Sequence, residues 1–152
     1  MKDLKYLMAY SVPLSVVVSF YFKGPFSYVA LAYVFLFIPL IESILPVKVE
    51  EYSTDDINKR TLNRIFDLLL YLNVPIVYII LGYGLYNFST SVLSTYEYIG
   101  LVFALGILLA TNAVNVAHEL GHRKNKFEVL LTRLLLLPCL YMHFTLEHNH
   151  GH

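Results

Sequence analysis

Four long apolar runs dominate this chain and most restrict what it can fold into. They cover residues 4–22, 26–45, 65–88 and 98–117. A helix needs about 20 apolar residues to cross the hydrocarbon core of a bilayer. Hydrophobic residues make up 57% of the chain and charged residues only 14%, and a soluble fold of this size leaves too much surface exposed to hide them. The sequence therefore predicts an all-α integral membrane protein with four transmembrane helices.

The first run follows a short charged start, as the apolar region of a secretory signal peptide also does. It is longer than such a region, and no small-residue cleavage site closes it. We therefore expect a retained helix, joined to the second helix by a tight turn at Lys23-Gly24-Pro25. Residues 46–64 should form a polar connection, and residues 87–97 a short loop rich in Ser and Thr.

The distribution of positive charge predicts the orientation of these helices. If the N-terminus is cytoplasmic, all but one of the 11 Lys and Arg residues lie inside, and the exception is Lys23. This asymmetry follows the positive-inside rule. The net charge of zero argues against a nucleic-acid partner, and the excess of apolar residues implies membrane lipid as the partner. Cys139 is the only cysteine, which excludes an internal disulfide and a thiolate metal cage.

All six histidines lie between residues 118 and 152, after the fourth apolar run. His118 and His122 are one helical turn apart, so both imidazoles can reach one metal ion. His148 and His152 repeat that spacing, and each pair has a glutamate beside its first histidine. The pattern predicts a metal site, although imidazole suits iron, zinc, copper and nickel alike.

One enzyme class that fits the first pair is the zinc proteases. His118-Glu119-Leu120-Gly121-His122 matches their pattern, in which two histidines bind zinc and the glutamate acts as general base. The extended pattern also needs Gly and His where this chain has Asn125 and Glu128. An intramembrane zinc metalloprotease with Glu147 as third ligand stays open, but it leaves the later histidines unused.

A second class uses both histidine clusters. The segments 115–123 and 143–152 resemble the first two histidine boxes of bacterial membrane-bound alkane monooxygenases, which are non-haem di-iron enzymes. Membrane fatty-acid desaturases and xylene monooxygenases belong to the same superfamily and remain as alternatives. Pro39-Leu40-Ile41-Glu42 also resembles a segment of that family, so the resemblance covers essentially the whole chain.

The resemblance implies roles for individual residues. Four histidines match iron-ligand positions, namely His118, His122, His148 and His152. Three neighbours match positions that should orient the imidazoles rather than bind the metal, namely Glu119, His143 and Glu147. His150 should be a surface or substrate-side polar group, and Glu42 should reach the lipid headgroups.

The resemblance also implies a reaction and a location. Two irons would activate O2 for the terminal hydroxylation of n-alkanes to 1-alkanols, with electrons from a rubredoxin or ferredoxin. The protein would lie in the bacterial inner membrane as a multi-pass protein with its N-terminus in the cytoplasm. Residues 1–152 are expected to be the N-terminal part of a longer di-iron oxygenase domain and to be inactive alone.

Two further features complete the expectations. The apolar stretch 129–142 is too short to span a bilayer comfortably and lies between the two clusters. We expect it to lie along the cytoplasmic interface or to be a re-entrant helix, broken at Pro138.

In the fourth run, small residues at helical spacing predict close helix packing, and these are Gly100, Ala104, Gly106, Ala110, Ala113 and Ala117.

Overall fold

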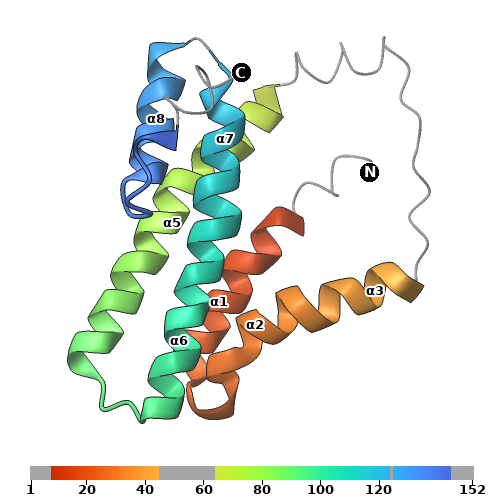
Figure 1. Cartoon of the computed structure of the whole chain (residues 1–152), viewed down its shortest axis with the longest axis vertical. Helices are drawn as coiled ribbons and strands as arrows, with labels where there is room; N and C mark the ends of the chain where they lie inside the picture. The colour runs from red at the N-terminus through yellow and green to blue at the C-terminus, as the bar shows by residue number, and fades with distance from the viewer. Residues whose placement is uncertain (1–7, 45–63, 124, 145–152) are drawn as a thin grey trace.

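The computed structural model describes residues 8–44, 64–123 and 125–144, which form helices and turns without any strand. Three helices lie side by side in Figure 1: α1 (Ser11–Phe22), α5 (Arg64–Thr90) and α6 (Thr95–Leu108). α6 continues through the π-helical turn η4 (Leu109–Val114) into α7 (Asn115–Gly121). The prediction of an all-α fold is confirmed for this part of the chain.

Three helical stretches are long and apolar enough to cross a membrane: Gly24–Ile44, Ile65–Thr90 and Thr95–Gly121. They correspond to the second, third and fourth predicted spans. The first predicted span is represented by the shorter apolar helix Met8–Phe22, and its first residues lie outside the described part. Four complete spans therefore stay a prediction.

The predicted turn after the first helix is present. The backbone of Lys23 and that of Gly24 both have a φ of 51°, and the amide of Phe26 donates to the carbonyl of Lys23 at 2.9 Å. The chain then continues through η2 (Gly24–Tyr28), α2 (Val29–Ala32), η3 (Tyr33–Phe37) and α3 (Ile38–Ile44). Figure 1 shows α3 leaning away from the other helices, and Glu42 is exposed on it.

The loop predicted at residues 87–97 is shorter than expected, because α5 extends to Thr90 and α6 begins at Thr95. Asn87 and Thr90 do not break α5, because their side chains donate to the carbonyls of Tyr83 and Tyr86 one turn back. Ser94 and Glu97 form a capping box that starts α6. The prediction was wrong here because it treated polar residues as loop residues.

The predicted packing of small residues holds at four of the six positions. Gly100, Ala104, Ala113 and Ala117 are buried. Gly106 and Ala110 are exposed, so the prediction was wrong for these two. The reason is helical geometry, since Gly106 lies about 200° around the helix from Ala104, and Ala110 follows Gly106 by one turn.

α8 (Lys126–Leu136) packs beside α7 and α5 and does not run the length of the helix bundle (Figure 1). Partway along it, the hydroxyl of Tyr78 in α5 donates to the carbonyl of Leu134 at 2.8 Å. α8 ends before Pro138, as predicted, and the chain then turns at residues 137–140. The prediction that this stretch lies along the cytoplasmic interface or is re-entrant stays a prediction. Its helix starts earlier than expected, at Lys126.

Candidate metal centre

The first histidine pair lies at the end of α7, where His118 is in the last turn and His122 is the C-cap residue. The two Nε2 atoms of His118 and His122 are 3.1 Å apart. Metal–nitrogen bonds of about 2.0–2.1 Å, at right or tetrahedral angles, place two ligand nitrogens roughly 2.8–3.4 Å apart. His118 is half-buried and His122 is exposed. The donor atoms and their separation therefore fit two ligands of one metal ion.

The returning chain after α8 brings the start of the second cluster to this pair. The ring of Phe144 lies 5.6 Å from that of His118 and 5.3 Å from that of Tyr141. His143 is exposed, with its ring 4.8 Å from the ring of Tyr141. The chain has thus come back to α7 one residue after His143.

The remaining predicted site residues are not all placed. Glu147, His148, His150 and His152 lie outside the described residues. Within the described ranges, no group of three or more His, Cys, Asp or Glu side chains is arranged to hold a metal ion. Glu119 is exposed. Its orienting role, and those of His143 and Glu147, stay predictions.

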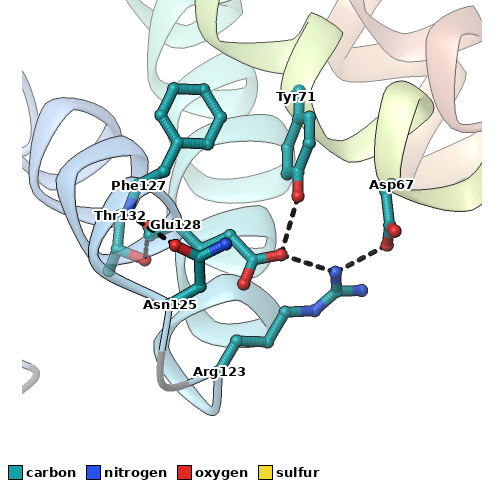
Figure 2. Close-up of polar contacts among 7 residues, drawn as sticks. All are labelled: Asp67, Tyr71, Arg123, Asn125, Phe127, Glu128 and Thr132. Atoms are coloured by element: carbon teal, nitrogen blue, oxygen red, sulfur yellow. Dashed lines mark hydrogen bonds and ion pairs between the residues drawn. The ribbon is translucent and has the colours of Figure 1, made fainter. Parts of the chain in front are cut away.

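Immediately after His122, a cluster of charged and polar side chains fixes the turn from α7 to α8 (Figure 2). Nη1 of Arg123 donates to Oδ1 of Asp67 at 2.6 Å and to Oε1 of Glu128 at 2.8 Å. The hydroxyl of Tyr71 donates to the same Oε1 at 2.7 Å. These bonds join α5 to both sides of the α7–α8 turn. We call Asp67, Tyr71, Arg123 and Glu128 the Arg123 cluster.

The Arg123 cluster explains how a carboxylate can be buried here. Glu128 has a side chain only 8% exposed, and a buried charge is tolerated where it is paired and hydrogen-bonded. The hydrogen bond to Asp67 raises the pKa of Arg123, and this outweighs the lowering effect of burial. The guanidinium therefore stays charged and keeps its partners. Asn125 begins α8 beside it, because its side chain accepts a hydrogen bond from the amide of Phe127 at 3.0 Å.

No family model matches the chain. Curated relatives do match it. It is 36% identical over 118 residues to alkane 1-monooxygenase 1 of Alcanivorax borkumensis. It is 31% identical over 115 residues to the alkane 1-monooxygenases of Pseudomonas putida and of Ectopseudomonas oleovorans. The matched segment of the chain is therefore similar to part of the alkane 1-monooxygenases. Each match covers 76% of this chain, and the chain spans 28% of the length of each relative.

The similarity to these relatives confirms the predicted resemblance to the alkane monooxygenases. These relatives are all enzymes called monooxygenases, so the oxygenase interpretation is favoured over the zinc protease. Sequence reasoning missed the side chains that support the site. Neither Asp67 nor Tyr71 was given a role from the sequence. An acidic residue within an apolar run is a signal that could have directed attention to Asp67.

Proposed function

We propose that this chain forms part of a membrane-bound alkane 1-monooxygenase that hydroxylates n-alkanes at their terminal carbon. In this proposal the metal is a pair of irons, and the ligands from this chain are His118, His122, His148 and His152. The observation that carries it is the 3.1 Å separation of the His118 and His122 Nε2 atoms. That pair lies on a chain whose relatives are named for this reaction.

The overall reaction takes one alkane, one O2, two electrons and two protons to one 1-alkanol and one water. Bound iron supplies the activation of O2. A one-electron carrier of the rubredoxin or ferredoxin kind supplies the electrons. The substrate class fits a membrane protein, because n-alkanes dissolve in lipid and His118 lies on the apolar stretch Thr95–Gly121, which is long enough to cross a bilayer.

The residues of the chain hold, orient and shield the site. α7 fixes the spacing of His118 and His122, since residues four apart on a helix are neighbours on one face. Phe144 lies beside the ring of His118, which limits the access of water on that side. Glu119, His143 and Glu147 are proposed to orient imidazoles, since ligating histidines usually donate their second N–H to a nearby acceptor.

The proposal includes a topology. The four apolar runs cross the bacterial inner membrane, with the N-terminus and the histidine clusters on the cytoplasmic side. The support is the placement of Lys and Arg in the sequence, together with three helices long enough to span. The described helix Met8–Phe22 is shorter than a membrane span. The proposed topology therefore requires a longer helix for the first crossing.

The test is the metal content of the full-length protein, purified in detergent and analysed for elements. We expect about two irons per chain, and their loss in His118→Ala and in His148→Ala. His150→Ala is the matched control and should keep both irons, because His150 is not proposed as a ligand. The wild type should then convert octane to 1-octanol with a reduced rubredoxin or ferredoxin. One zinc per chain that is unaffected by His148→Ala would overturn the proposal.

A further inference from the structure

Two buried asparagines face each other in the interior of the helix bundle. The Nδ2 of Asn112 donates to the Oδ1 of Asn73 at 2.9 Å and to the carbonyl of Ala9 at 3.4 Å. The Nδ2 of Asn73 donates to the carbonyl of Leu69 at 2.9 Å. Asn73 is 5% exposed and Asn112 is 3% exposed. Burying polar side chains within apolar spans costs free energy, and such residues often have a functional role.

Asn112 lies within the π-helical turn η4, between α6 and α7. The neighbouring Thr111 hydroxyl donates to the carbonyl of Ile107 at 2.7 Å and lies 2.9 Å from the Oδ1 of Asn112. A π-helical turn adds one residue to an α-helix and is frequent at functional sites. One added residue rotates the rest of the helix by about 100°, at 3.6 residues per turn. The segment rotated by η4 is α7 with its C-cap residue, and these carry His118 and His122.

The hydrogen bonds of Asn112 connect η4 to two separate parts of the chain. One is α5, through Asn73, and the other is the segment before α1, through Ala9. The same carbonyl of Leu69 that accepts from Asn73 also accepts from the hydroxyl of Tyr10. Three segments far apart in the sequence therefore meet at the turn, and a rotation of α7 would require these bonds to break.

We propose that Asn73 and Asn112 are positioning residues. They keep η4 in its π-helical conformation and so fix the rotation at which α7 presents His118 and His122 to the metal. This inference rests on the proposed function. If η4 changed from a π-helical to an α-helical turn, α7 would rotate, and the histidine pair would turn away from Phe144 and the returning chain. Neither asparagine binds metal or substrate, so their effect is transmitted through η4.

Asn87 provides a matched control. It is the same residue type, it lies on α5 like Asn73, and it is also 5% exposed. Its Nδ2 donates within its own helix, to the carbonyl of Tyr83 at 2.8 Å. It lies at the opposite end of α5 from the α7 end of the bundle. Asn87→Leu therefore removes a buried amide without touching η4.

The experiment compares Asn73→Leu, Asn112→Leu, the double variant and Asn87→Leu in the full-length protein. Cobalt(II) is titrated into metal-free protein and followed by its visible absorption. We expect Asn73→Leu and Asn112→Leu each to weaken cobalt affinity about 10- to 100-fold, as loss of supporting residues around a metal site does, and to change the cobalt spectrum. The double variant should be no weaker than the worse single variant, because both remove one shared interaction. Asn87→Leu should bind as the wild type does.

A second measurement needs no metal. Spin labels at Asn115→Cys and Leu130→Cys, in a Cys139→Ser background, report the distance between α7 and α8 by pulsed electron resonance. We expect this distance to shift in Asn112→Leu and to stay at the wild-type value in Asn87→Leu. Unchanged cobalt binding and unchanged distance in Asn112→Leu would overturn the inference, as would equal effects of Asn87→Leu. A wild type that binds no metal would overturn the proposed function alone, because the distance is measured on metal-free protein.

Discussion

Nη1 of Arg123 lies 2.6 Å from Oδ1 of Asp67, which ties the residue after His122 to the beginning of α5. The histidine-bearing helix α7 is thus held at both ends. At its start, the hydrogen bond between Asn112 and Asn73 connects η4 to α5. Since both anchors lie on α5, movement of α7 relative to α5 is opposed at two points on either side of the histidine pair.

The first prediction concerns the charge of Arg123. Arg123→Met leaves Glu128 buried without its cation, and breaking a buried pair costs about 3–5 kcal/mol. Because the side chains of Arg123 and Asp67 are 29% and 36% exposed, water screens part of this, and we expect a loss of about 1–3 kcal/mol. The free energy of unfolding, measured by SDS titration in mixed micelles, tests it.

Arg133→Met is the matched control for this prediction. Arg133 is an exposed arginine in the last turn of α8, and no ion pair joins it to any described residue. Its replacement should change the free energy of unfolding by no more than about 0.5 kcal/mol. Equal losses in the two variants would show that the Arg123 cluster adds no stability beyond that of a surface charge.

Much of the fold could be predicted from hydropathy, because a bilayer demands long apolar helices. α5 and α6 follow the third and fourth apolar runs, and the turn at Lys23 and Gly24 follows from glycine and proline. Both ends of the loop between α5 and α6 were misjudged. Ser94 and Glu97 carry the spacing of a capping box, which would have placed the start of α6 correctly. That signal is local and was available in the sequence.

The support of the candidate site was not predictable in the same way. The spacing of His118 and His122 is a property of one helix, so their facing Nε2 atoms could be anticipated. The contact between Asn73 and Asn112 depends on how α5 and η4 are rotated against each other, and the sequence has no periodicity that sets this rotation. The π-helical turn adds one residue of phase, which a regular helical pattern does not show.

The second prediction tests the close packing at Gly100. A Cβ built on Gly100 would lie 2.8 Å from Cε2 of Tyr28 and 2.9 Å from Cβ of Ser27. Gly100→Ala should therefore force η2 away from α6 and destabilise the protein by about 1–3 kcal/mol. Gly106→Ala is the control on the same helical segment, because a Cβ there meets nothing within 4 Å. It should be neutral or stabilising by up to about 1 kcal/mol. Thermal unfolding in detergent of both variants measures the difference, and equal melting temperatures would contradict the packing argument.

The third prediction concerns the reversal after α8. The amide of Tyr141 donates to the carbonyl of Leu136, and the amide of Leu140 donates to that of Leu137. These two bonds form a Schellman motif, in which the residue at the Leu140 position takes a left-handed conformation and is usually glycine. Leu140 has a φ of 53°, which costs a residue with a Cβ about 1–2 kcal/mol. Its side chain is 87% exposed, so little described packing compensates.

Leu140→Gly should therefore stabilise the protein by about 1 kcal/mol, because the turn that returns the chain to His118 would no longer be strained. Leu137→Gly is the matched control, since Leu137 is also exposed but ends α8 with a φ of −58°, where glycine brings only greater freedom to the unfolded chain. It should destabilise by roughly 0.5–1 kcal/mol. SDS titration of both variants gives the two changes in unfolding free energy. A loss of stability in Leu140→Gly would mean that the side chain of Leu140 packs against something that outweighs the backbone strain.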